Sequence, residues 1–335
     1  MASNNSYILS LRATTVTMTR TLPIVIITFG VAGNILNTMV LSRKKLRLNP
    51  CAFYFVASSI SSIIAIVSGL INRMLGTWLA DPTETIAWLC KTRALFVFPS
   101  KMVAGWLIAS AAIDRWLTSS EYVRRRQMSS IKNAYRGTAL ILIFALLLHG
   151  QVFYCFEANV LNAPSKCYMK LESCLYLNDL IYAIFSNFIP ITVMFIFGLL
   201  TIVNIRRSQQ RINLVSTMTQ TRSVELGIGQ NSQTKRLNRR LLLTLFIQIF
   251  LYIIFAMPQV FIKMYTSFSA RNYKAPVTLA TESLIFNIFL LLSYFVNVLP
   301  FYVYTLAGGK LFRDAVFTRS FKNVKEWIQR RLHFL

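Results

Sequence analysis

The sequence predicts an all-α membrane protein, a bundle of seven transmembrane helices followed by a short amphipathic helix. Of its 335 residues, 55% are hydrophobic and 14% are charged, and the mean hydropathy is +0.52. Soluble domains of this size carry more charge. The apolar residues also cluster into runs of about 20 residues, the length that a helix needs to span roughly 30 Å of hydrocarbon. Because a backbone in lipid must satisfy its own hydrogen bonds, each run is expected to be helical.

The apolar runs fill most of the chain and form one predicted transmembrane domain over 21–309. The expected spans are about 21–42, 48–72, 90–118, 137–157, 180–205, 241–263 and 283–306. Residues 1–20 are the predicted N-terminal tail, and 310–335 form the predicted amphipathic helix and tail. The longest connection, 206–240, is polar and poor in aromatic residues, so a mobile loop is expected there.

The basic residues are divided unequally between the two sides of the predicted bundle. The stretches 43–47, 124–136, 206–240 and 310–331, which share one side, hold 24 of the 36 Lys and Arg residues. The positive-inside rule places that side and the C-terminus in the cytoplasm, with the N-terminus outside a plasma membrane. The net charge of +25 then indicates topology and attraction to anionic lipids rather than a nucleic-acid partner. The sequon at Asn4 lies on the predicted outer side, where glycosylation is possible.

Three of the five cysteines fall on the predicted outer side. Cys90 opens the third span, and Cys167 and Cys174 lie in the loop between the fourth and fifth spans. This compartment permits disulfides, and a bond from Cys90 to Cys167 would tie the loop to the third helix. Cys174 is the rival partner, because sequence does not fix connectivity. Cys51 and Cys155 are expected to be buried thiols.

The most unusual residue is Lys101, which interrupts the third span. It lies 14 positions before Arg115, about four helical turns or roughly 21 Å toward the outside. A charge near mid-membrane costs roughly 2.5–3.5 kcal/mol, so Lys101 should face a protein interior or a water-filled cavity. Three interpretations stay open: an anchor for an acidic or carbonyl group of a ligand, an internal pair with Glu282, or snorkelling outward.

Several motifs occur in a fixed order along the spans. Gly33-Asn34 lies in the first span, Cys90 precedes Arg115 by 25 residues, and Asp114-Arg115-Trp116 closes the third span. One proline follows in each of the last three spans: Pro190, Pro258 and Pro300. With the seven spans and the outer N-terminus, this set resembles the rhodopsin-like (class A) G-protein-coupled receptors over about residues 20–320. "KLFRDAVF", which begins at Lys310, resembles the start of the family's short helix along the inner membrane face.

The resemblance implies a receptor that couples an extracellular ligand to a heterotrimeric G protein. Asp114 would hold Arg115 by a local ion pair at rest, and Arg115 would be released when the sixth helix moves about Pro258. Val97 stands where amine receptors carry an Asp, and Ser293 stands at the retinal lysine of opsins. Neither an amine nor retinal is therefore expected, and the mixed charges of the outer loops favour a peptide, such as a neuropeptide.

The chain also departs from the family's motifs, which identifies it as a divergent member. In order, the sodium-binding Asp, the fifth-span Tyr, the sixth-span Trp and the seventh-span Tyr are replaced by Ser62, Gly198, Ala256 and Val303. Trp116 stands in for the Tyr of Asp-Arg-Tyr. The seventh-span Asn is lost at Leu299, and Asn297, two places earlier, is expected to take over polar contacts.

The inventory of reactive groups argues against an enzyme. The two histidines are His149, inside a span, and His333, near the end of the sequence. No His, Cys and carboxylate cluster has metal-ligand spacing, and no Gly-rich phosphate loop is present, so neither a metal nor a cofactor is expected. One alternative is a seven-span transporter or channel, although the repeated halves and broken helices typical of transporters are not found. The other is a receptor-like protein that does not couple to a G protein.

Overall fold

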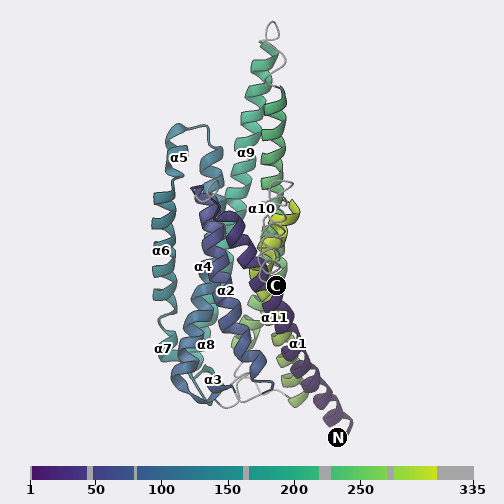
Figure 1. Ribbon diagram of the computed structural model, residues 1–335. Coiled ribbons are helices and arrows are strands. Elements are labelled where there is room, and N and C mark those ends of the chain that lie inside the picture. The colour runs from purple at the N-terminus through teal and green to yellow at the C-terminus, as the bar shows by residue number, and fades with distance from the viewer. Residues whose placement is uncertain are drawn as a thin grey trace, which may run out of the picture.

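The computed structural model describes residues 2–43, 48–78, 81–160, 166–218, 228–269 and 275–307. Within these ranges, seven helical stretches are long and apolar enough to cross a membrane, as the sequence predicts. The helices are α1 (Ala2–Leu41), α2 (Pro50–Leu75), α3 (Pro82–Thr85), α4 (Ala87–Ser119), α5 (Val123–Met128), α6 (Ile131–His149), α7 (Val152–Cys155), α8 (Glu172–Ala183), α9 (Ile189–Met218), α10 (Ile228–Phe268) and α11 (Pro276–Ala307). The strands β1 (Phe156–Glu157) and β2 (Tyr168–Met169) pair antiparallel, and a π-helical segment, Ile184–Phe188, joins α8 to α9 (Figure 1).

The two ends of the bundle differ in what they carry. One end holds α3, the β1–β2 pair and two disulfides, and we call it the disulfide end. The opposite end holds α5, and we call it the α5 end. There α9 and α10 extend together past the ends of the other helices (Figure 1).

Several helix starts follow from their capping residues. The Asn49 side chain accepts a hydrogen bond from the backbone N–H of Cys51 at 2.9 Å, and Pro50 occupies the first helical position of α2. Ser130 caps α6 in the same way, through the N–H of Asn133. Such caps satisfy donors that a helix start leaves unpaired, and proline is favoured at the first position because its missing N–H is not needed there.

Three helices extend into polar sequence in which other structure was expected. The prediction of a mobile loop over 206–240 is wrong for the described parts, because α9 runs to Met218 and α10 begins at Ile228. Most of the predicted N-terminal tail belongs to α1, which begins at Ala2. A polar composition excludes lipid contact but does not disfavour helix, and Arg, Gln and Leu are good helix formers. Residues 310–335, with the predicted amphipathic helix, lie outside the described residues.

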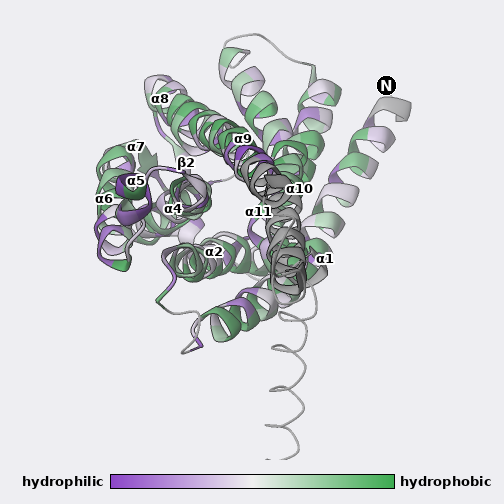
Figure 2. Cartoon of the chain, turned by 90° about the horizontal axis from the view of Figure 1, so that it is seen from above, coloured by the Kyte–Doolittle hydropathy of each residue, from purple (hydrophilic) through white to green (hydrophobic). Residues whose placement is uncertain are grey.

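Helix α4 is the most enclosed of the spanning helices. In its most apolar window 61% of the residues are buried, against 22% for the span that includes α6. It packs against α2, α6 and α9, which surround it in the view along the bundle (Figure 2). Hydrophobic residues cover much of the helices in that view, as expected for a lipid-facing surface. The middle of α4, which carries Lys101, therefore lies inside the bundle.

The fifth span contains a π-helical segment, Ile184–Phe188, just before Pro190, where the sequence predicts a kink. Proline has no N–H, so Pro190 cannot donate to the backbone carbonyls of Phe185 or Ser186 in the preceding turn. Both carbonyls accept side-chain hydrogen bonds instead: Phe185 from Trp106 Nε1 of α4 at 2.9 Å, and Ser186 from Tyr252 Oη of α10 at 3.1 Å. The proline thus creates acceptors that tie α4 and α10 to the middle of this span.

Candidate functional site

Two disulfides fix the segment that covers the disulfide end. Cys90, in the first turn of α4, bonds to Cys167 just before β2, with 5.6 Å between their Cα atoms. The rival partner Cys174 bonds to Cys155 at the end of α7. The expectation that Cys155 is a buried thiol is therefore wrong, because α6 ends at His149 and Cys155 reaches the covering segment beyond it. Cys51 is a buried free thiol.

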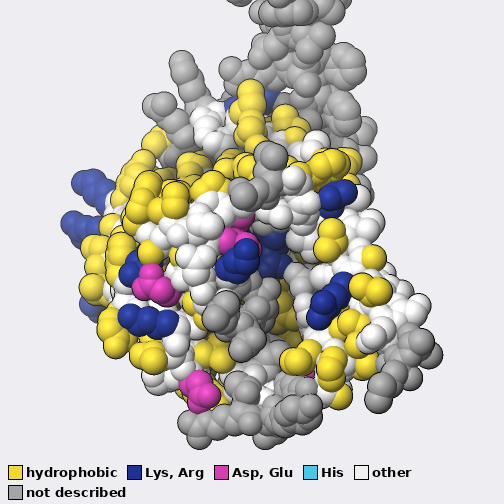
Figure 3. All heavy atoms as spheres, turned by 90° about the horizontal axis from the view of Figure 1, so that it is seen from below, with side chains coloured by type: hydrophobic (Ala, Val, Ile, Leu, Met, Phe, Trp, Pro, Cys, Tyr) yellow, Lys and Arg dark blue, Asp and Glu magenta, His cyan; other side chains and the backbone are white. Residues whose placement is uncertain are grey.

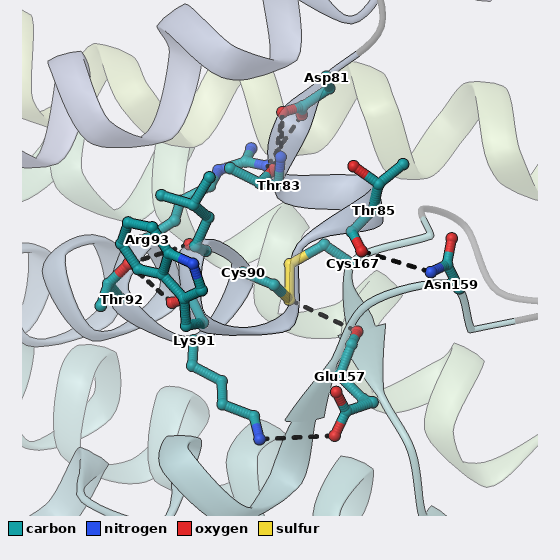
Figure 4. The surroundings of a disulfide bond; sticks show 12 residues. Asp81, Thr83, Thr85, Cys90, Lys91, Thr92, Arg93, Glu157, Asn159 and Cys167 are labelled. Atoms are coloured by element: carbon teal, nitrogen blue, oxygen red, sulfur yellow. Dashed lines mark hydrogen bonds and ion pairs between the residues drawn. A yellow bond between two sulfur atoms is a disulfide. The ribbon is translucent and has the colours of Figure 1, made fainter.

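Polar contacts around Cys90–Cys167 hold the covering segment against α3 and α4 (Figure 4). Lys91 Nζ lies 3.4 Å from the Glu157 carboxylate of β1. Arg93 lies 3.5 Å from the Asp81 carboxylate, which also caps α3 through the N–H of Thr83. These contacts join α3, the start of α4, β1 and the residue before β2. The covering segment is therefore fixed in place over the bundle interior.

Beneath this segment lies a cavity of about 870 Å³, a volume that includes space open to solvent. Side chains from α2, α4, α8, α10, α11 and the β1–β2 pair line it. Four are basic: Arg73, Arg93, Lys101 and Lys263. Figure 3 shows basic side chains beside an acidic one near the centre of this face of the molecule. We call this space the basic cavity.

Of the three predicted pocket residues, two line the basic cavity. Val97 and Lys101 face it from α4, whereas Glu282 is not part of its lining and accepts a hydrogen bond from Tyr265 Oη at 3.1 Å. Lys101 Nζ neither pairs with Glu282 nor snorkels outward. It donates to Ser293 Oγ at 3.2 Å and lies 3.4 Å from the centre of the Tyr294 ring, so it points inward between α4 and α11.

Three basic residues of the cavity are missing from the sequence-based prediction. Arg73, Arg93 and Lys263 belong to the basic residues that charge counting places on the predicted outer side, and the sequence gives none of them a role in a pocket. Arg73 follows Gly69 by four positions, and Lys263 follows Gln259 by four, although only the structure shows that Gly69 and Gln259 line the cavity. Residues four apart share one face of a helix, and all of these line the cavity.

A buried ion pair joins the fifth and sixth spans beside the basic cavity. Lys263 Nζ of α10 pairs with Asp179 Oδ1 of α8, and the Asp179 side chain is 2% exposed. Ser267 Oγ donates to the other carboxylate oxygen at 2.6 Å. Burial raises the pKa of nearby Tyr168 in β2, so its hydroxyl stays protonated and remains a hydrogen-bond donor toward the cavity.

Gly69 leaves room for the ring that faces Lys101. A Cβ atom at position 69 would lie 1.9 Å from Tyr294 Oη, so Gly69→Ala is expected to displace Tyr294. Overpacking of this kind costs about 1–3 kcal/mol, and we expect a drop of several degrees in the melting temperature of the detergent-purified protein. Gly150→Ala is the control, since its Cβ would lie 3.4 Å from its nearest neighbour, and equal losses for both variants would contradict the prediction.

The predicted switch residues lie at the α5 end, where Asp114 and Arg115 each contact another segment of the chain. The Asp114 carboxylate accepts a hydrogen bond from Ser129 Oγ at 2.6 Å, which holds the connection between α5 and α6. Arg115 Nε donates to Cys51 Sγ of α2 at 3.1 Å. The Arg115 charge also acts on the Asp114 carboxylate, and the local ion pair between the two neighbouring side chains stays a prediction.

Trp116 of α4 packs against α9. Its ring meets Phe197 edge-on with 5.1 Å between centroids, and the Arg125 guanidinium lies 5.2 Å from its centre. One turn on, Asn204 Nδ2 donates to Ser119 Oγ at 3.2 Å. Gly198, next to Phe197, supplies no side chain here.

A small polar cluster joins α1, α2 and α11 in the middle of the bundle. Asn34 Nδ2 donates to the Asn297 backbone carbonyl at 2.8 Å, and Ser62 Oγ donates to Asn297 Oδ1 at 3.3 Å. The expectation that Asn297 takes over polar contacts is confirmed. Among the residues that the structure describes, no group of three or more His, Cys, Asp or Glu side chains is placed to hold a metal ion.

Seven spans, a cavity covered by a disulfide-linked segment and an Asp-Arg pair at the far end define a seven-span receptor. The family model "7 transmembrane receptor (rhodopsin family)" matches residues 33–302, and the chain belongs to that family. The chain is also similar to "Neuromedin U receptor homolog nmur-2" of Caenorhabditis elegans, with 25% identity over 115 residues. That match covers 34% of this chain and 28% of the relative, so the chain matches less than a third of the relative's length.

Proposed function

We propose that this protein is a plasma-membrane receptor that binds an extracellular ligand in the basic cavity and passes the signal to a heterotrimeric G protein at the α5 end. The observation that carries the proposal is the course of α4. This one enclosed helix presents Lys101 to the cavity and Arg115 to the opposite end. The uneven distribution of Lys and Arg supports an outward disulfide end and an inward α5 end. The same topology would expose Asn4 for glycosylation and the α5 end to anionic lipids.

Movement of the sixth span is the proposed route between the two sites. Gln259 and Lys263 of α10 line the cavity, and Pro258 lies immediately before Gln259, where it removes a backbone hydrogen bond. Pro300 lies inside α11 and removes a backbone hydrogen bond in the same way. Ala256, at the place of the family's Trp, lines a second space of about 370 Å³ below Lys101. Movement of α10 would repack the side chains around this space, and a ligand would shift the population between two helix arrangements.

A peptide is the favoured ligand class. Charged groups of both signs surround the cavity, which is open to solvent, and two disulfides fix the segment that covers it. The partial similarity to a neuromedin U receptor homolog supports the same choice. The departures at Ser62, Gly198, Ala256 and Val303 favour, as a second candidate, a receptor-like protein that binds its ligand without coupling to a G protein.

The test is Arg115→Ala in cells challenged with peptide libraries, with dissociation of the G protein as the measurement. Arg115 is the charged group of α4 nearest the inner surface, so we expect the signal to fall at least about tenfold at unchanged surface expression. Lys132→Ala is the control, because Lys132 is exposed at the start of α6 on the same end. A signal that survives Arg115→Ala would refute this coupling route, and binding without any signal would favour the second candidate.

A further inference from the structure

We infer that the basic cavity binds a carboxylate of its ligand through Lys101, either the C-terminal carboxylate of a peptide or an Asp or Glu side chain near its end. The inference rests on the receptor function proposed above. It adds the chemistry of the ligand group that reaches deepest into the basic cavity. It follows from how the four basic side chains of the cavity are partnered.

Two of the four are already neutralised by protein carboxylates. Lys263 pairs with the buried Asp179. Arg93 lies 3.5 Å from Asp81 and also donates to Thr83 Oγ1 at 3.1 Å and to the Gly69 carbonyl at 3.3 Å. These two cations are held by α8 and by α2 and α3, so their charges and donors are occupied within the fold.

The other two have only neutral partners. Arg73 donates to the amide oxygen of Asn287, whose own amide donates to the Ser283 carbonyl. Lys101 has a hydroxyl, Ser293 Oγ, and the face of the Tyr294 ring. Of the side chains that the structure describes, no carboxylate forms an ion pair with Arg73 or Lys101. The cavity therefore carries two more positive charges than negative ones.

This excess charge is unfavourable in the free receptor. The charges of Lys263 and Arg73 act on Lys101 in the repulsive sense, and burial removes much of the water that would stabilise its ammonium group. A carboxylate beside Lys101 would relieve both effects and would form a charge-assisted hydrogen bond. An ammonium or guanidinium group of a ligand would add to the repulsion instead.

The position of Lys101 indicates that the carboxylate lies near an end of the ligand. Lys101 lines both the basic cavity and the smaller space of about 370 Å³ beneath it, so it marks the floor of the open volume. The nearby wall is apolar, with Phe98, Phe286 and Leu290. A carboxylate flanked by apolar side chains suits this wall, whereas a dianionic phosphate would leave charge against it.

The experiment uses a library of short peptides made twice, once with a free C-terminal carboxylate and once with a C-terminal amide. Binding is read as the rise in melting temperature of the purified full chain, which needs no G protein, and signalling is read in cells. We expect the active peptides to lose at least about 30-fold in potency when the carboxylate is removed, because one partner of a buried charge pair is lost. If the essential carboxylate is that of an Asp or Glu side chain, replacing this residue of the peptide with Asn or Gln causes the loss of potency, and amidation of the C-terminus does not.

Lys101→Gln tests the assignment on the receptor side. We expect it to lower the potency of the carboxylate peptides by a similar factor and to leave the amide and Asn or Gln counterparts within about threefold. Lys91→Gln is the matched control, since Lys91 lies on the same helix and pairs with Glu157 outside the cavity lining. The melting temperature of the free variants shows that both fold.

Three results would overturn the inference: amides as potent as acids, equal effects of Lys101→Gln on charged and neutral peptides, or no carboxylate peptide that raises the melting temperature. A thermal shift that depends on the carboxylate, without a cellular signal, would support the inference and argue against G-protein coupling. A cellular signal without any preference for a carboxylate would support coupling and refute the inference.

Discussion

Replacing Asp179 with Ala is expected to lower the free energy of unfolding by about 3–5 kcal/mol. The substitution removes the carboxylate that pairs with Lys263 and accepts a hydrogen bond from Ser267 Oγ at 2.6 Å. Lys263 is buried between Phe98 and Tyr182, where an unpaired ammonium group is poorly solvated. Because the pair joins α8 to α10, its loss also loosens the fifth and sixth spans at the disulfide end.

Thermal unfolding of the detergent-purified protein measures this effect, with an expected fall on the order of 5–10 °C. Glu157→Ala is the control at the same end, because the Lys91–Glu157 pair is partly exposed and should contribute at most about 1 kcal/mol. Asp179→Leu combined with Lys263→Met should recover most of the loss, since apolar residues of similar volume can replace a buried pair. If Asp179→Ala lowers the melting temperature no more than Glu157→Ala does, the prediction is wrong, and Lys263 then reaches solvent through the cavity.

The number of spans could be predicted from the sequence because the bilayer imposes it. An apolar run must be a helix in lipid, so hydropathy alone finds all seven spans. The limits of the helices could not be predicted in this way, since α9 continues past the apolar run to Met218 in polar sequence. Hydropathy reports where lipid contact is possible, and helix propensity continues independently of it.

The candidate site could be predicted only where one helix determines it. Val97 and Lys101 follow from their positions on the third span, and both line the cavity. The partners of Lys101 could not be predicted, because Ser293 lies 192 residues away and meets it only when α4 packs near α11. The Asp179–Lys263 pair is of the same kind, with 84 residues between its members. The sequence predicts Asp179 in an outer loop and Lys263 at the end of the sixth span, whereas each lies inside a helix and faces the other.

The two disulfides are expected to contribute unequally to stability and differently to ligand binding. Cys90–Cys167 closes a sequence separation of 77 residues and Cys155–Cys174 one of 19. Chain entropy favours the longer closure, which predicts about 4.5 kcal/mol for the first bond and about 3.3 kcal/mol for the second. Replacing both cysteines of a pair with Ala should therefore lower the melting temperature more for Cys90 and Cys167.

The difference in ligand binding should be larger still, because only one of these bonds borders the basic cavity. Cys167 lines it, and the next two residues, Tyr168 and Met169, contribute side chains to its wall. Loss of Cys90–Cys167 releases this wall from α4, so the thermal stabilisation by any peptide ligand should be largely abolished. Loss of Cys155–Cys174 leaves the bond between Cys167 and Cys90 of α4 in place. The thermal stabilisation by the ligand should then be retained, although the protein without ligand is less stable. The prediction is contradicted if the variant without Cys155–Cys174 has the lower melting temperature. It is also contradicted if that variant, rather than the one without Cys90–Cys167, loses the stabilisation by the ligand.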